Sequence, residues 1–412
     1  MEELYGVGRI VLRGGTDHGF ARVILGAMAA GPLTFVGHDA SRTGAPMVLR
    51  SLLSWARARR VLGDASLVLL RGGPLLEDFR SLLPTTVLDT RVRRIATGIA
   101  AGLRAVAPMA GERPAFRRFP PAARLHGTVV ANTLAALPVA AGLCHRSATL
   151  ICHVHELDGV AARILPRPED RREAVGRVDH FVACSAGVRS MLVDRWAAPD
   201  SKVSVVHEFV DRPSQRVSRE DARRRLGSDQ RTHVVLGVGA AGPRKGTDHF
   251  LSLAATIEEG RTGPRATWVG GDPGSAAWQE MRHDVEKCGL NERVTLVPTI
   301  DDPGIHLAAA DLLVTTSRED PYPLAVLEAA VRGIPVAGFG GSGWAEMATE
   351  AGCDDLVHPV GDVLGLARSV EELLGSSERR AGVGDRLAAW ALAERTTETA
   401  APLFWETIGM AV

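Results

Sequence analysis

Residues Leu312–Glu346 read LLVTTSREDPYPLAVLEAAVRGIPVAGFGGSGWAE, and this stretch decides the fold. Its first five residues are apolar or β-branched, which is typical of a buried parallel strand. Pro323 suits the first turn of a helix over 324–331, and Gly333 suits its end. A second strand is expected over 334–339, followed by a glycine-rich turn. These elements form one unit of a doubly wound α/β sheet, whose ligands bind at the carboxyl ends of the strands.

Two acidic residues are expected to face that edge of the sheet. Asp320 lies in the loop, and Glu328 lies on the helix eight residues later. The helix N-terminus presents positive partial charge and free N–H groups to an anion. Together with two carboxylates that accept hydrogen bonds from hydroxyl groups, this arrangement suits a nucleotide sugar. The spacing alone is equally typical of two solvated acids.

The segment SREDPYPLAVLEAAVRGIPV resembles the signature of the retaining GT-B glycosyltransferases of the GT4 family, or glycosyltransferase group 1. That family carries two acids in an E-x7-E pattern, which is D-x7-E here. The resemblance implies that Glu328 binds the donor ribose and that Asp320 contacts the donor sugar near the reacting centre. It also implies that Leu324 lies in the donor site. Glu319 stands beside the shorter Asp320 and would compensate for its missing methylene group.

The family's usual Gly-Phe-Gly after the first acid is Pro321-Tyr322-Pro323 in this chain. Proline has no backbone N–H, so two backbone donors are lost. Contacts that those amides make to sugar or phosphate in the relatives therefore cannot be carried over to this chain.

A second loop, Gly239–Gly246, follows an expected strand over 233–238 and contains Arg244 and Lys245. Only three of the 48 basic residues are lysines, so a lysine between glycines is informative here. Two cations at a strand end can neutralise a diphosphate. In the family, an arginine and a lysine five residues apart hold the donor pyrophosphate. Lys245 matches, and because Ala240 stands where the arginine is expected, Arg244 is predicted to replace it. A solvated basic turn is the alternative.

The first half of the chain opens with an expected strand over 33–37 and the loop HDASRTGAP over 38–46. This is the opening unit of a Rossmann-like domain. Gly44 and Ala45 would allow the backbone to approach the donor phosphates closely. Three polar residues of the same loop are candidates for binding phosphate or acceptor, namely Ser41, Arg42 and Thr43. The alternative is an ordinary loop whose Ser and Thr cap the following helix.

A histidine pair ends the expected strand over 148–154. His153 and His155 would share one face of the strand, and Glu156 follows. Two histidines and one acid could bind a metal, but the spacing supplies no further ligand for zinc, so no metal is predicted. The H-x-H-E stretch resembles the family's histidine segment facing the cleft, which makes His155 the candidate for contact with the donor sugar. A structural histidine is the competing interpretation.

The composition excludes several classes of protein. The 412 residues are enough for two domains and carry a net charge of zero, which argues against nucleic acid as the main partner. No apolar run approaches the roughly 20 residues of a membrane span, and the start of the chain has no signal-peptide core, so a cytoplasmic protein is expected. The five cysteines have no metal or disulfide spacing. Residues 91–126 hold eight arginines, so peripheral contact with an acidic membrane face is an alternative to a solvated surface.

The prediction is an α/β protein of the GT-B fold, with two Rossmann-like domains facing across a cleft. Its expected parts are an N-terminal extension (1–30), an acceptor domain (31–212), a donor domain (213–395) and a C-terminal helix that crosses back to the first domain (396–412). The resemblance implies a bacterial, metal-independent, retaining glycosyltransferase that moves a sugar from an NDP-sugar to a glycan, lipid-linked or small-molecule acceptor, without another cofactor. An NDP-sugar epimerase, a glycoside phosphorylase and a nucleotide-sugar-binding protein without catalysis remain as alternatives.

Overall fold

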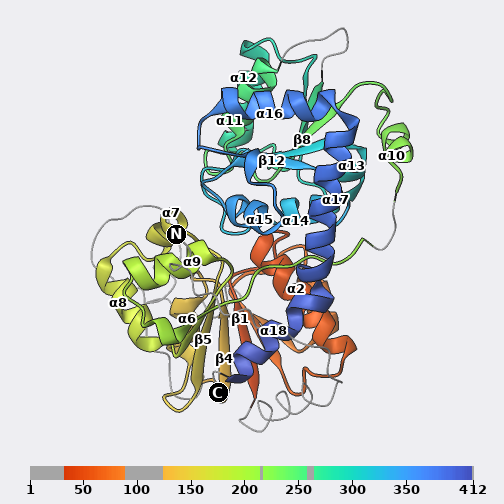
Figure 1. Cartoon of the computed structure of the whole chain (residues 1–412). Coiled ribbons are helices and arrows are strands. Elements are labelled where there is room, and N and C mark those ends of the chain that lie inside the picture. Colours follow the sequence, from red (N-terminus) through yellow and green to blue (C-terminus); the bar gives the residue numbers. More distant parts are fainter. Residues whose placement is uncertain (1–31, 89–123, 214–216, 258–263, 411–412) are drawn as a thin grey trace.

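The computed structural model describes residues 32–88, 124–213, 217–257 and 264–410, which form two α/β domains (Figure 1). The predicted extension 1–30 and most of the basic run 91–126 lie outside these residues. Among the helices of the described part, none combines the length and the apolar character that a membrane span requires.

The first domain is built on a seven-stranded parallel sheet in the order β3-β2-β1-β4-β5-β6-β7. Its strands are β1 (Leu33–Gly37), β2 (Ser66–Leu69), β3 (Thr85–Val87), β4 (Thr128–Asn132), β5 (Thr149–Val154), β6 (His180–Ala183) and β7 (Val203–Val205). Strand order reverses between β1 and β4, which are hydrogen-bonded neighbours. Such a switch point leaves a crevice at the carboxyl ends of the two strands, where ligands bind in this class of sheet.

The second domain repeats this plan with six strands in the order β10-β9-β8-β11-β12-β13, and its switch point lies between β8 and β11. The strands are β8 (Val234–Val238), β9 (Arg265–Val269), β10 (Val294–Val297), β11 (Leu312–Thr315), β12 (Val336–Phe339) and β13 (Val357–His358). Every residue of β11 and β12 is buried. Helices cover both faces of this sheet, which explains why these two strands read as continuous apolar runs in the sequence.

Helices alternate with the strands in both domains. The first domain contains α2 (Gly44–Ala58), α3 (Leu76–Leu82), α6 (Leu137–Leu143), α7 (Asp158–Ile164), α8 (Pro168–Arg177) and α9 (Ala186–Ser190), with a π-helical turn over Met191–Arg195 and a 3₁₀ turn over Asp200–Lys202. The second contains α10 (Arg219–Arg225), α11 (Thr247–Thr256), α12 (Ala276–Lys287), α13 (Gly304–Ala309), α14 (Leu324–Ala330), α15 (Trp344–Glu350), a 3₁₀ turn over Asp354–Leu356, α16 (Val363–Gly375) and α17 (Ser377–Glu394).

The chain then returns to the first domain. Helix α17 leads down from the second domain, and α18 (Thr397–Met410) lies beside α2 on the first (Figure 1). Phe404 and Trp405 of α18 belong to the core that also holds Phe35 of β1. The Trp405 ring meets the Phe35 ring edge-on, with 6.0 Å between the ring centroids. The predicted domain limits at 212/213 and 395/396 stay predictions, while the packing of α18 ties the end of the chain to the first domain.

Candidate functional site

The switch points of the two domains face each other. Helix α2 begins at Gly44 just beyond β1, and helix α14 begins at Leu324 just beyond β11. A Cβ atom placed on Gly44 would lie 3.9 Å from the Leu324 Cδ1 atom. The loop predicted to approach the donor phosphates therefore meets the loop that contains the two acids of the D-x7-E pattern.

Lys245 and Asp320 form an ion pair at the carboxyl edge of the second sheet. Only 18% of the Lys245 side chain and 9% of the Asp320 side chain are exposed. Gly246 makes this approach feasible because it has a φ of 67°, and any side chain there would overlap the Thr316 carbonyl at the end of β11. The two residues predicted to act on the donor are thus brought together, with opposite charges in a partly buried place.

Arg244 is tied to the same loop. Its Nη1 donates to the Glu319 carbonyl oxygen at 2.9 Å, and its own carbonyl oxygen accepts from the Arg318 N–H at 2.9 Å. These bonds join the loop after β8 to the loop after β11. The Arg244 guanidinium is therefore held against the loop that contains Glu319 and Asp320. Its predicted contact with phosphate stays a prediction.

Glu328, on α14, has an unusual environment for a carboxylate. Burial raises its pKa from the ordinary 4.5 to about 7, and the charge of Asp302 acts in the same direction, although Arg332 opposes both. The Glu328 carboxylate accepts no hydrogen bond from any residue that the structure describes, because Arg332 donates to the Glu328 main-chain carbonyl instead, at 2.7 Å. A partly buried acid without a partner and with a displaced pKa is typical of a functional site.

Glu319 is engaged by the other domain. Its two carboxylate oxygens accept hydrogen bonds from the backbone N–H groups of Gly159 and Val160, each at 3.1 Å, at the N-terminus of α7. The carboxylate thus satisfies free N–H groups at a helix end, where negative charge is favoured. In this structure Glu319 is a contact between domains, which differs from the expectation that it compensates for the shorter Asp320.

Glu346 and Arg42 also make contacts between the two domains. The Glu346 carboxylate accepts from the Ala186 N–H at 3.0 and 3.1 Å, at the start of α9, and lies 2.6 Å from His207 Nε2. Arg42, predicted to bind acceptor or phosphate, lies 3.1 Å from the Asp301 carboxylate of the second domain. These partners are more than a hundred residues apart in the chain, so sequence spacing carried no signal for them.

Tyr322 accounts for part of the unusual Pro-Tyr-Pro segment. Its ring is buried, its hydroxyl oxygen accepts from Arg395 Nε at 2.8 Å, and its centroid lies 5.1 Å from that of His207. Burial raises the pKa of this phenol well above its ordinary value. Arg395 lies between α17 and α18, so the tyrosine connects the donor loop to the segment where the chain returns to the first domain.

The loop after β1 holds the predicted acceptor residues. Ser41 Oγ and Thr43 Oγ1 lie 2.8 Å apart in an exposed position. The Thr43 side chain does not cap α2, and the first turn of α2 contains no acidic residue. The alternative that a hydroxyl of this loop caps the helix is therefore wrong, and the N-terminus of α2 keeps its free N–H groups.

The carboxyl ends of β4 and β5 hold a buried polar cluster. His155, the predicted sugar-contacting residue, has a side chain that is only 5% exposed, and both of its ring nitrogens lie at hydrogen-bond distance from side chains, Asn132 and Glu208. Glu156 is also buried, and its carboxylate accepts from the N–H groups of Leu134 and His155. Asn132 and Glu208 were not among the predicted site residues, although Asn132 ends β4 and Glu208 follows β7 in the chain.

Among the residues that the structure describes, two groups of side chains could hold a metal ion. The first is His155, Cys184 and Glu208, and the second is His207, Glu346 and Glu350, with the ligand atoms of each group within 4.8 Å of one another. In both groups a histidine nitrogen is already hydrogen-bonded to a glutamate, at 2.7 and 2.6 Å. Hydrogen bonding therefore accounts for these contacts as they stand, and the predicted absence of a required metal stays a prediction.

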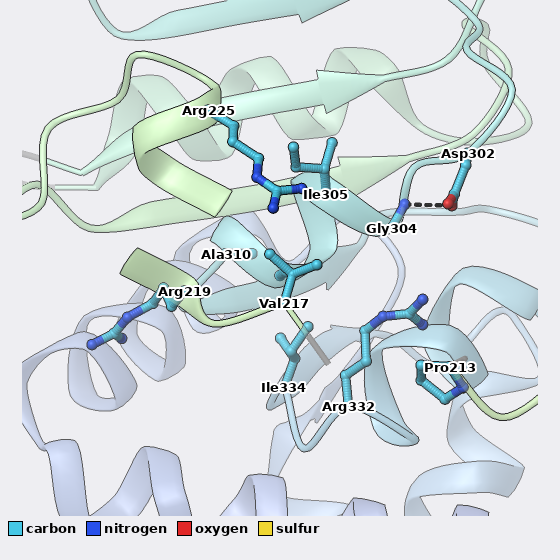
Figure 2. Close-up of a pocket in the computed structure, with 11 residues that line it drawn as sticks. Pro213, Val217, Arg219, Arg225, Asp302, Gly304, Ile305, Ala310, Arg332 and Ile334 are labelled. Atoms are coloured by element: carbon cyan, nitrogen blue, oxygen red, sulfur yellow. Dashed lines mark hydrogen bonds between the residues drawn. The ribbon is translucent and has the colours of Figure 1, made fainter. Parts of the chain in front are cut away.

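A cavity of about 560 Å³ lies on the flank of the second domain (Figure 2). It is bordered by Pro213 and Val217, by α10 and α13, and by Arg332 and Ile334 (Figure 2). None of the residues predicted to bind the donor lines it. It does, however, share Asp302 and Arg332 with the surroundings of Glu328.

The strand orders, the facing switch points and the crossing C-terminal helix define the GT-B fold. Crystal structures confirm this class. The HepE protein of Anabaena, solved in complex with UDP-glucose, superimposes with a TM-score of 0.74 over 92% of this chain and 99% of that one, at 19% identity. The glycosyltransferase WaaG of lipopolysaccharide biosynthesis superimposes with a TM-score of 0.66 over 91% of this chain and 99% of that one, at 16% identity.

The sequence of the second domain is similar to a known family. Residues 218–388 match the model of the glycosyl transferases group 1, the family that the D-x7-E segment resembles. The D-inositol 3-phosphate glycosyltransferase of Segniliparus rotundus is 31% identical over 47% of this chain and 44% of its own length. The 2-deoxystreptamine N-acetyl-D-glucosaminyltransferase of Streptomyces fradiae is 30% identical over 41% of this chain and 40% of its own length. The chain thus spans less than half the length of these two relatives.

Proposed function

We propose that this protein transfers a sugar from a nucleoside-diphosphate sugar to an acceptor hydroxyl, with retention of the anomeric configuration. The observation that carries the proposal is Glu328, a partly buried carboxylate that accepts no hydrogen bond from the described residues and whose pKa is raised to about 7. Ribose hydroxyls would supply the missing donors. The family match and the UDP-glucose that HepE holds support a nucleotide sugar as the ligand.

The proposed donor site joins three electrostatic elements. Lys245 would neutralise the diphosphate as it is bound and as it leaves, with Arg244 contributing from the same loop. The free N–H groups at the start of α2, in Gly44 and Ala45, would meet the phosphates from the first domain. Asp320, already paired with Lys245, would orient it and contact the donor sugar near the reacting carbon.

Catalysis would rest on stabilising the leaving diphosphate and on positioning, with the acceptor attacking from the side of the leaving group. The cations and the helix N-termini would supply the positive charge without a metal ion. The acceptor would enter beside Ser41 and Thr43, which are exposed at the first switch point. Polysaccharides, lipid-linked sugars and specialised metabolites are the proposed acceptor classes.

Thermal-shift screening against UDP-, GDP-, ADP- and dTDP-sugars tests the donor, because a ligand that binds only the folded state raises the Tm. Transfer activity is then measured for Lys245→Ala and Glu328→Ala, with Lys287→Ala as a matched lysine control at the exposed end of α12. We expect a loss of at least tenfold in the first two variants and none in the control. Full activity in both of the first two variants would falsify the proposal.

Assays on the same purified protein distinguish the transferase from the alternative functions. Sugar NMR without any acceptor detects an epimerase, and replacing the nucleotide by inorganic phosphate detects a glycoside phosphorylase. A protein that binds a nucleotide sugar tightly and shows no turnover with any acceptor class would be a binding protein.

A further inference from the structure

A row of hydrogen-bonded side chains runs across the carboxyl edge of the first sheet. Glu208, beyond β7, lies 2.7 Å from His155 Nδ1, beyond β5. His155 Nε2 lies 3.3 Å from Asn132 Oδ1, at the end of β4. Asn132 Nδ2 donates to the Ala45 carbonyl oxygen at 3.2 Å, in the first turn of α2. The row thus connects the far side of the sheet to the helix that begins at the switch point.

The chemistry of the partners fixes the direction of these bonds. The Ala45 carbonyl can only accept, so the amide nitrogen of Asn132 must face it and the amide oxygen must face His155. The Nε2 atom of His155 therefore carries a hydrogen. The Nδ1 atom either accepts a hydrogen bond from a protonated Glu208 or donates one to the Glu208 carboxylate. In both cases neither ring nitrogen remains available for another hydrogen bond.

The His155 ring is also held on its face and through its backbone. The His153 ring packs against it with 3.9 Å between the centroids, and Phe404 of α18 packs against His153 at 4.9 Å. Both nitrogens of His153 are buried without a hydrogen-bond partner among the described residues, so His153 acts as a neutral packing surface. The backbone N–H of His155 donates to the Glu156 carboxylate at 3.0 Å. His155 is therefore fixed in place.

The first turn of α2 is the element that this row holds. The N-termini of α7 and α9 are each occupied by a carboxylate of the second domain, from Glu319 and Glu346. The N-terminus of α2 has neither an acid in its first turn nor a side-chain cap. It faces Leu324 of the second domain across the Gly44 position. A helix end that Asn132 holds and that has no capping carboxylate of its own suits an anion that lies between the domains.

We propose that Asn132, His155 and Glu208 are positioning residues, which hold the first turn of α2 in register for the diphosphate of the donor. This inference rests on the proposed function for the identity of the anion. It gives His155 a role different from contact with the sugar, because the histidine acts through Asn132 on the backbone of Ala45.

Hydrogen exchange measured by mass spectrometry tests the positioning without any substrate. The variant is Asn132→Leu, which has nearly the same shape and cannot bond to Ala45 or His155. The matched control is Ser51→Ala, which removes a 3.1 Å bond between the same helix and Asp211, two turns further on. We expect faster exchange in peptides covering residues 44–50 for Asn132→Leu and not for Ser51→Ala. Equal exchange in Asn132→Leu and the wild type overturns the proposal.

Steady-state kinetics test the consequence for the donor, with UDP-glucose as the first probe and then the sugar nucleotide found in the thermal-shift screen. Loss of one uncharged hydrogen bond predicts a rise of roughly three- to tenfold in the donor KM of Asn132→Leu, with the acceptor KM unchanged. Glu208→Gln should stay near the wild-type value, because its amide can donate to Nδ1 of a neutral His155. Glu208→Leu should behave like Asn132→Leu and provides the test if that variant does not fold.

Hydrogen exchange and kinetics together distinguish failure of the positioning role from failure of the proposed function. If no nucleotide sugar binds the wild type, the proposed function fails, while the exchange data still decide whether the row positions α2. If donors bind and the donor KM of both leucine variants equals that of the wild type, the positioning role fails and the proposed function stands.

Discussion

Replacing Glu328 by glutamine should stabilise the ligand-free protein at neutral and alkaline pH. The Glu328 carboxyl is partly buried and accepts no hydrogen bond from the described residues, and burial raises its pKa from 4.5 to about 7. The unfolded chain ionises this group near its ordinary pKa, whereas the folded protein holds the proton until higher pH. The charged form is therefore disfavoured in the folded state, and glutamine removes that penalty.

The size of the effect follows from the difference between the two pKa values. A difference of about 2.5 pH units corresponds to about 3 kcal/mol, at 1.36 kcal/mol for each unit. Below about pH 4.5 the Glu328 carboxyl is protonated in both the folded and the unfolded state, so it does not lower the free energy of unfolding. Between about pH 4.5 and 7 the wild type loses stability relative to Glu328→Gln, and above that range the full difference of about 3 kcal/mol remains.

Urea-induced unfolding of the wild type and of Glu328→Gln at pH 5, 6, 7 and 8 measures this difference. Glu286→Gln, at an exposed position of α12, is the matched control and should show no trend with pH. An advantage of Glu328→Gln that is the same at every pH, or that shrinks as pH rises, would refute the reasoning about burial. The same variant should bind the sugar nucleotide more weakly than the wild type, because the ionised acid is the stronger acceptor for ribose hydroxyls.

Three further predictions concern the second domain's loops. Glu319→Gln weakens the contact with the N-terminus of α7, so small-angle scattering should report a larger radius of gyration; an unchanged radius would contradict this. Tyr322→Phe removes the acceptor for Arg395 and should cost about 1 kcal/mol in urea unfolding; no loss would mean that the hydroxyl does not stabilise the fold. Asp320→Asn frees Lys245, so UDP should raise the Tm of this variant more than it raises the Tm of the wild type. An equal or smaller rise would argue that Asp320 and the diphosphate do not compete for Lys245.

The second domain was largely predictable because its signals are local. The run that became β11, the helix that became α14 and the turn at Gly333 all follow one another in the order that the motif requires. The ends were less accurate, since β12 begins at Val336 and not at residue 334. The helical end of the chain is divided into α17 and α18 at Arg395 and Thr396, and Thr396 forms a β-bridge with Val210 of the first domain.

The sequence indicated candidate residues for the site but not the partners that these residues contact in the structure. Lys245 and Asp320 were both candidates, but no pattern showed that they pair with each other, because that contact depends on the packing of β8 beside β11. The roles of Glu319 and Glu346 depend on how the two domains meet. His155 was a candidate from the sequence, whereas its partners Asn132 and Glu208 looked like ordinary residues at or after strand ends.

The positions of these contacts suggest how donor binding and domain closure are linked. Glu319, which holds the first domain, is the direct neighbour of Asp320, which holds Lys245. A diphosphate that takes Lys245 from Asp320 would leave the Asp320 carboxylate without this partner, one residue away from the glutamate that caps α7. Linkage is reciprocal. The factor by which donor binding strengthens or weakens the contact with α7 equals the factor by which that contact changes the affinity for the donor. Glu319→Gln therefore tests both directions, since a change in domain separation without a change in donor affinity would show that the two are uncoupled.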